Sequence, residues 1–120
     1  MRPAVNRLGR LLSRAEFERV YSCGRRFRSD YLQLIVHENG LDKANVGITV
    51  PDRTVKSAVR RNRLKRVLRE RLRDVSVSIA PGYDLVLTLL LDPGGNDSEK
   101  LGSELKHLLE KSGLSKGEDR

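Results

Sequence analysis

The side chains best suited to bind a ligand lie close together in the middle of the chain, in the stretch RNRLKRVLR at positions 61–69. Arginine presents a planar guanidinium that grips a phosphate through two hydrogen bonds, and lysine adds a compact positive charge. Asn62 contributes an amide that both donates and accepts hydrogen bonds. Because folded RNA is recognised mainly through phosphates, hydroxyls and shape, this combination favours contact with a ribose-phosphate backbone.

Positive charge is concentrated in two blocks of the sequence. The 120 residues include 24 Lys and Arg against 16 Asp and Glu, which gives a net charge of +8. Residues 53–73 hold ten basic residues and one acidic residue, and residues 1–30 hold eight arginines and three acidic residues. Charges packed this densely repel one another unless a polyanion relieves them. We therefore expect a nucleic-acid partner rather than a membrane surface.

Residues that could catalyse a reaction on their own form no recognisable group. The two histidines, His37 and His107, match no motif, and the sequence has no phosphate-binding glycine loop and no His-Glu-x-x-His pattern. A single cysteine, Cys23, excludes an internal disulfide and a metal site built from several thiolates. The pattern favours a binding protein without catalytic residues of its own. Two alternatives stay open, namely a ribosomal or general structural RNA-binding protein and a protein nuclease that uses His37 or a carboxylate.

No segment of the sequence indicates a membrane span or export. Uninterrupted apolar runs are as short as Leu89–Leu91, and no apolar stretch follows the charges near the N-terminus. We expect a cytoplasmic protein folded as one α+β domain over residues 1–120, with flexible ends at 1–12 and 114–120.

A long helix is needed to present the arginines. Thr54 is a candidate N-cap, and the helix is predicted to continue to about residue 74. At about 100° per residue, one stripe of this helix is apolar, and a second stripe, rotated toward the opposite side, is polar and cationic. The apolar stripe contains Leu64, Leu68, Leu72 and Val75, with Val67 at its edge. The cationic stripe contains Asn62, Lys65, Arg66, Arg69 and Arg73.

The other elements follow from capping residues, alternation and turns. Ser13 and Glu16 form a capping box at the start of the first helix. Two extended segments are predicted to pair as a hairpin across a turn at Asn39–Gly40. The resulting order of elements is typical of an α+β domain with helices on a small sheet. The predicted elements are helix 14–22, strands 27–37 and 46–50, the arginine-rich helix, strand 83–91, and a last helix from Asp97 or Ser98 to Gly113.

The arginine-rich stretch also resembles the protein component of bacterial ribonuclease P. That family carries the pattern R-N-R-x-K-R-x-x-R, which residues 61–69 match without a gap. Three further segments look like parts of the same family and extend the resemblance over most of the chain. They are Ala15-Glu16-Phe17 with Val20, Tyr21 and Gly24, then Val46–Val50, and Gly82–Val86. Asp52 and Asp92 depart from the family, which often has basic residues at these two places.

The resemblance implies a fold and a division of labour. The fold is an αβββαβα two-layer sandwich of the ribosomal protein S5 domain 2-like kind, with a left-handed βαβ crossover, which is a rare hand for such connections. The implied function is that of the protein subunit of an RNA-based endoribonuclease. The catalytic RNA removes the 5′ leader of precursor tRNA with Mg²⁺ held mainly by RNA, and the protein binds both RNAs without supplying a catalytic residue. The resemblance leaves the positions of the metal ions open.

The resemblance assigns two sites to particular residues. Phe17 and Tyr21 match aromatic residues that line a cleft for the single-stranded leader, where bases can stack on them. A place in the hydrophobic core is the alternative for both rings. Tyr31, Gln33 and Ile35 form the expected floor of this cleft, because their strand face is more polar than the alternate face. The RNA-contacting helix corresponds to Arg61, Asn62, Arg63, Lys65, Arg66 and Arg69.

Overall fold

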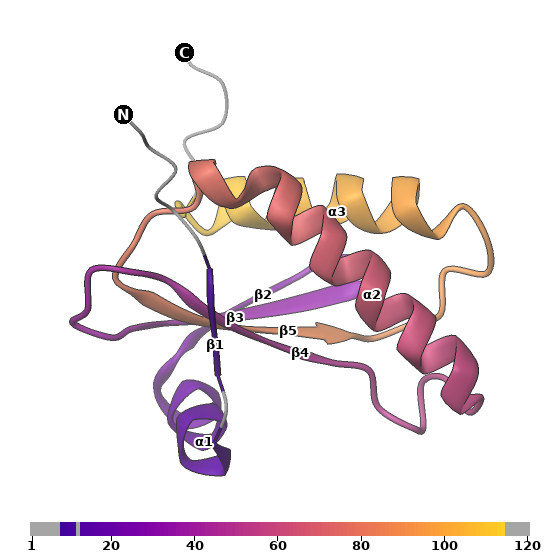
Figure 1. Cartoon of the computed structure of the whole chain (residues 1–120), viewed down its shortest axis with the longest axis horizontal. Coiled ribbons are helices and arrows are strands. Elements are labelled where there is room, and N and C mark those ends of the chain that lie inside the picture. Colours follow the sequence, from indigo (N-terminus) through magenta and orange to yellow (C-terminus); the bar gives the residue numbers. More distant parts are fainter. Residues whose placement is uncertain (1–7, 12, 115–120) are drawn as a thin grey trace.

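The computed structural model describes residues 8–11 and 13–114, in which five strands form one sheet that carries three α-helices (Figure 1). The elements are β1 (Gly9–Arg10), α1 (Arg14–Cys23), β2 (Arg25–Arg28), β3 (Leu32–Glu38), β4 (Asn45–Thr49), α2 (Ala58–Val75), a 3-10 turn (Ser76–Ser78), β5 (Tyr83–Leu89) and α3 (Asp97–Lys111). α2 and α3 lie over one face of the sheet, and α1 lies on the other side (Figure 1). The predicted α+β class is confirmed.

β5 lies between β3 and β4, so the predicted hairpin of the two earlier strands is wrong. The strand order is β1-β4-β5-β3-β2, with β3 antiparallel and β4 parallel to β5. β5 is buried along almost its whole length, and a strand that is apolar on both faces belongs in the middle of a sheet. β4, α2 and β5 therefore form a βαβ unit with adjacent parallel strands, as the resemblance implies.

The extended segment predicted at 27–37 consists of two strands rather than one. The Ser29 amide donates to the Leu32 carbonyl at 2.9 Å and closes a tight turn between β2 and β3. β2 begins at Arg25, earlier than predicted, and forms one edge of the sheet. The three arginines of β2 therefore belong to the sheet and not to a loop.

Backbone hydrogen bonds hold β1 and the last described residues, both of which lie in segments expected to be flexible. The Gly9 amide donates to the Ala44 carbonyl at 2.8 Å, which pairs β1 with β4. The Leu114 carbonyl accepts from the Ala80 amide at 2.9 Å, and the Leu114 side chain is buried. The rest of these two segments, residues 1–7, 12 and 115–120, lies outside the described residues.

The N-cap of α2 lies three residues later than the predicted one. The hydroxyl of Ser57 accepts a hydrogen bond from the Arg60 amide at 3.2 Å and caps the helix. Thr54 lies instead in a turn, where its amide donates to the Pro51 carbonyl at 3.0 Å. Both residues are good N-caps, and the choice between them depends on tertiary packing, because Val55 is buried in the core before the helix starts.

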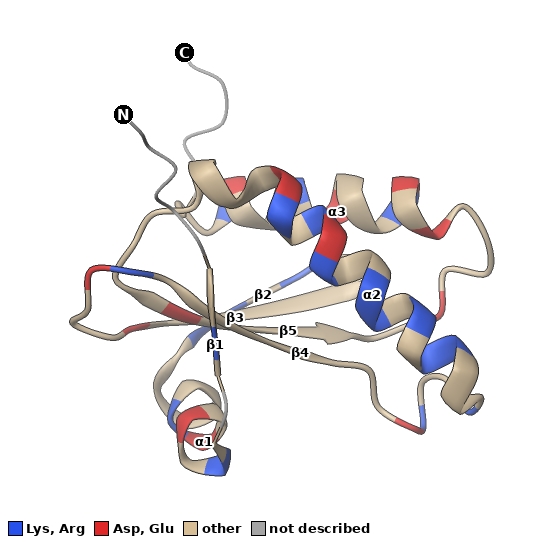
Figure 2. Cartoon of the chain, in the orientation of Figure 1, with Lys and Arg blue, Asp and Glu red and all other residues tan. Residues whose placement is uncertain are grey.

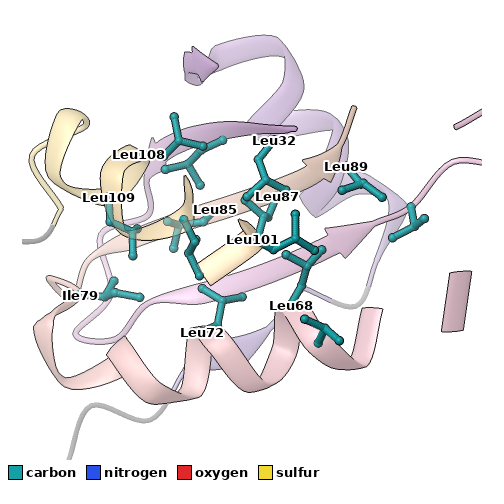
Figure 3. Packing of buried hydrophobic residues seen from close by; sticks show 14 of the residues in the cluster. Leu32, Leu68, Leu72, Ile79, Leu85, Leu87, Leu89, Leu101, Leu108 and Leu109 are labelled. Atoms are coloured by element: carbon teal, nitrogen blue, oxygen red, sulfur yellow. The ribbon is translucent and has the colours of Figure 1, made fainter. Parts of the chain in front are cut away.

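One side of α2 supplies leucines to the main core, as the spacing predicts. Leu64, Leu68 and Leu72 are buried, and Val67 lies at the edge of the buried set. Figure 3 shows Leu68 and Leu72 pointing from α2 toward the leucines of the sheet and of α3. Because this side is fixed against the core, the side chains on the opposite side of α2 must face solvent.

Candidate nucleic-acid interface

The solvent side of α2 is rich in cationic residues, and Figure 2 marks the Lys and Arg positions of the helix in blue. We call it the basic stripe, and it consists of Asn62, Lys65, Arg66, Arg69 and Arg73. Lys65 is partly buried, and the other four residues are exposed. In the described part of the chain, no hydrogen bond or ion pair engages any of these side chains. The stripe therefore offers unpaired donors and positive charge to a partner.

Two arginines of the motif at 61–69 lie outside the basic stripe and contact other groups of the protein. Arg61 donates from Nη1 to the carbonyls of Val55 and Lys56, at 2.9 and 3.0 Å, and holds the preceding loop against the helix. Arg63 is more exposed, with its Nε 3.5 Å from a carboxylate oxygen of Asp97. Arg61 therefore shapes the start of α2, whereas Arg63 lies beside the basic stripe with most of its surface free.

Arg60 joins the start of α2 to the start of α3. Its guanidinium donates to Asp92 from Nε at 3.1 Å and from Nη2 at 2.7 Å. It donates to Asp97 from Nη1 and Nη2, both at 2.9 Å. We call these three residues the Arg60 clamp. Asp92 stands where the resembling family often has a basic residue. The clamp gives its carboxylate a structural partner inside the protein.

The clamp lowers the pKa of both carboxyls. Hydrogen bonds from Arg60 are the main cause for Asp92 and for Asp97, and backbone amides of the glycine loop add to the effect. The same two carboxylates raise the pKa of Arg60 further above its ordinary value. Asp97 is also the first residue of α3, where the helix dipole favours a negative charge. Its side chain is only 5% exposed, so an uncompensated charge there would be costly.

Replacing Arg60 by methionine is expected to destabilise the protein by about 1–3 kcal/mol at neutral pH, because Asp97 loses both hydrogen bonds from its closer charged partner and keeps only the more distant Arg63. A carboxyl whose pKa is lowered by folding stabilises the protein above its unfolded pKa, near 4, and loses that contribution as the pH falls through the folded pKa. The difference between wild type and Arg60→Met should therefore shrink toward about pH 3. Urea unfolding at the two pH values measures it.

Arg66→Met is the control for this prediction. It removes the same charge from an exposed position of the same helix, and it should change the free energy of unfolding by no more than about 0.5 kcal/mol. An equal loss of stability in both variants would mean that the clamp has no special role.

A groove of about 620 Å³ lies between α2 and the edge of the sheet, and we call it the α2 groove. Arg69 and Arg73 of the basic stripe line one side of it, and Phe17 of α1 lines another. The Phe17 ring lies directly over Gly47, where an added Cβ would be only 2.4 Å from the ring. Gly47 therefore allows the aromatic ring to lie against β4. β1, the residues on either side of it and β4 supply most of the remaining lining: Leu8, Gly9, Arg10, Leu11, Val46 and Ile48.

The structure separates the five residues predicted to form the aromatic cleft. Phe17 lines the α2 groove, Tyr21 is 36% exposed on α1, and Gln33 is partly buried on the same side of the sheet. Ile35 is fully buried beneath α1 and so presents no surface as a cleft floor. Tyr31 precedes β3 in the turn and packs toward α3, with the Lys100 ammonium 5.8 Å from its ring centre. Strand alternation shows which side chains share a face of the sheet, but it does not show which of them a helix covers.

Sequence reasoning missed several residues that line the α2 groove. Gly47, between Val46 and Ile48 in a strand, was the available signal, because an isolated glycine in a strand often marks a close approach by another group. Arg10 and Leu11 gave no signal, since nothing in the sequence predicts that this segment pairs with β4.

Comparison with known proteins identifies the family. A sequence model of the family described as Ribonuclease P matches residues 5–113. The chain belongs to the ribonuclease P protein family. The ribonuclease P protein component of a Pseudanabaena species is 35% identical over 98% of this chain and 99% of the relative. That of Clostridium kluyveri is 34% identical over 89% of this chain and 96% of the relative.

Solved structures agree with this assignment. The RNase P protein from Thermotoga maritima is similar with a TM-score of 0.67 and 27% identity, covering 92% of this chain and 98% of that one. The Staphylococcus aureus RNase P protein shares the fold with a TM-score of 0.81 at 22% identity, covering 91% and 99%. The resemblance read from residues 61–69 is therefore confirmed.

As a ribonuclease P protein, the chain is an RNA-binding component of a ribonucleoprotein endoribonuclease that acts in tRNA processing. The basic stripe accordingly lies on a protein whose partner is RNA. Among the helices of the described residues, none combines the length and the apolar character needed to cross a membrane.

Proposed function

We propose that this ribonuclease P protein docks on its catalytic RNA through the basic stripe of α2. The observation that carries the proposal is the set of exposed cations that have no partner among the described residues. Neighbouring cations on one helix repel each other, and a ribose-phosphate backbone relieves that repulsion while releasing bound counterions. Asn62 adds an amide for sugar hydroxyls or base edges, and Arg63 extends the contact along the flank. Arg61 supports the surface mainly by fixing the loop before the helix.

The α2 groove is the proposed place for the 5′ leader of precursor tRNA. Phe17 presents a ring against which an unpaired base can stack, a contact worth about 1–3 kcal/mol. Arg69 and Arg73 lie on the other side of the same groove and can hold leader phosphates. Tyr21 and Gln33 lie outside this groove, on the α1 side of the sheet, where the leader would continue.

In this proposal the hydrolysis belongs to the catalytic RNA, with Mg²⁺ held mainly by RNA. Mg²⁺ bound by the RNA would supply an activated water and would neutralise charge on the reacting phosphate. Within the described residues no group of three His, Cys, Asp or Glu side chains is placed to hold a metal ion. Asp92 and Asp97, which meet at the Arg60 guanidinium, already bind that residue. The described residues therefore do not fit a magnesium site, and the protein alone is not expected to cleave.

The test is leader removal by the cognate RNA subunit at low Mg²⁺ concentration, with and without the protein. We expect the protein to accelerate cleavage and to be inactive by itself. The holoenzyme should also bind precursor tRNA more tightly than mature tRNA. Cleavage by the protein alone would indicate a protein nuclease, and equal binding of precursor and mature tRNA would indicate a general structural RNA-binding protein. Either result, or the absence of acceleration, contradicts the proposal.

A further inference from the structure

Two arginines of α2 approach the same carboxylate oxygen at the start of α3. Arg60 donates from Nη1 to Oδ2 of Asp97 at 2.9 Å, and the Nε of Arg63 lies 3.5 Å from that same oxygen. Arg60 also donates from Nη2 to the other oxygen of Asp97 at 2.9 Å. The two arginines are three positions apart, so they lie on one side of the helix. Arg60 therefore takes the close place at Asp97, and Arg63 keeps the longer contact.

The two arginines differ in their freedom to leave Asp97. Asp92 fixes the Arg60 guanidinium by accepting from its Nε at 3.1 Å and from its Nη2 at 2.7 Å. The side chain of Arg60 is 27% exposed, whereas that of Arg63 is 58% exposed. Arg60 would have to give up all its bonds to the two carboxylates in order to reach an RNA phosphate. Arg63 can reach one at little cost.

Asp97 needs a cation beside it. Its side chain is only 5% exposed, and a buried carboxylate without a charged partner is costly. Lys100, one turn further along α3, is engaged by the Pro93 carbonyl at 2.8 Å. If Arg60 is removed, Arg63 is the cation already placed to pair with Asp97.

We infer that Arg60 is a positioning residue for RNA docking, because its pairing with Asp97 keeps Arg63 available to the catalytic RNA. This inference rests on the proposed function, in which α2 docks on that RNA. Loss of Arg60 draws Arg63 into an ion pair with Asp97, so a phosphate contact is lost at a residue that has not been changed. Asp92 supports the same arrangement by fixing Arg60.

The experiment measures the Kd of the full-length protein for the catalytic RNA at several salt concentrations, where circular dichroism shows each variant to be folded. Arg63→Gln should weaken binding about fivefold and lower the slope of log Kd against log salt by about 0.7–0.9. Arg60→Met should cause the same two changes. In the Arg63→Gln background, Arg60→Met should add no further change. Arg60→Gln should behave like Arg60→Met, so the test does not depend on one variant being folded.

Two second substitutions separate the capture of Arg63 from a simple loss of positive charge. Asp97→Asn, added to Arg60→Met, removes the carboxylate that captures Arg63, and it should restore the wild-type slope. Asp92→Asn, added to Arg60→Met, is the matched control. It restores the same net charge but leaves Asp97 charged and without Arg60, so it should not restore the slope.

The outcomes separate the inference from the proposed function. The inference is overturned if Arg60→Met keeps the wild-type slope, if both second substitutions restore the slope equally, or if Arg63→Gln leaves the slope unchanged. Arg66→Gln tests the proposed function separately, because Arg66 is exposed on the basic stripe, and it should lower the slope in each of these cases. If Arg66→Gln and Arg63→Gln both bind like wild type, the proposed function fails, and the inference fails with it.

Discussion

Replacing Arg66 and Arg69 together by glutamine is expected to weaken binding of the catalytic RNA about 100-fold and to reduce its salt dependence. Both side chains are exposed on the basic stripe and have no partner among the described residues. Each is therefore free to neutralise a phosphate, and each lost contact should lower the slope of log Kd against log salt by about 0.7–0.9. Equilibrium binding to the RNA subunit at several salt concentrations measures both effects.

The matched control replaces Lys106 and Lys111, two exposed lysines of α3, by glutamine. This variant loses the same charge from a different helix and should bind with the wild-type slope. If the control variant bound the catalytic RNA as weakly as the α2 variant does, the effect would come from net charge rather than from the basic stripe. An unchanged slope in the α2 variant would remove Arg66 and Arg69 from the contact surface.

Leu68→Ala is expected to lower the free energy of unfolding by about 2–5 kcal/mol. Leu68 is fully buried between α2, α3 and the sheet, so truncation removes apolar contacts and leaves a cavity. A loss of this size is a large part of the stability of a small domain. Urea unfolding of the free protein measures the change. Under conditions where the variant is still folded, it should bind RNA as tightly as wild type does.

Val59→Ala provides the comparison on the same helix. Val59 is 80% exposed, so its truncation should change stability by no more than about 0.5 kcal/mol. If Leu68→Ala unfolds at the same urea concentration as wild type, the assignment of the buried side of α2 is wrong.

The local features of this protein were readable from its sequence because they depend on residues close together. The spacing of Leu64, Leu68 and Leu72 identifies the buried side of α2, and the same helical geometry places Arg66 and Arg69 outside. The capping box of Ser13 and Glu16 is present as predicted. Both predictions use only the period of a helix or the chemistry of its first turn.

The missed features depend on residues far apart in the sequence. Arg60 looks like one more cation of the basic block, and its role is visible only when Asp92 and Asp97 are brought to it by the fold. The order of the strands is likewise a tertiary choice, since alternation says which side chains share a face but not which strands are neighbours. Ile35 shows the same limit, because its burial depends on where α1 packs.

The central place of β5 also has a consequence for synthesis of the chain. β3 and β4 share no hydrogen-bonded edge, and β5, residues 83–89, joins the β2–β3 pair to the β1–β4 pair. More than two thirds of the polypeptide must therefore be translated before the sheet can close. Until β5 is made, the arginine-rich nascent chain is incompletely folded and exposed beside ribosomal RNA. Strand pairing over such long sequence separations is slow. Nascent molecules are accordingly expected to be most vulnerable to proteolysis and to off-pathway RNA contacts just before β5 is made.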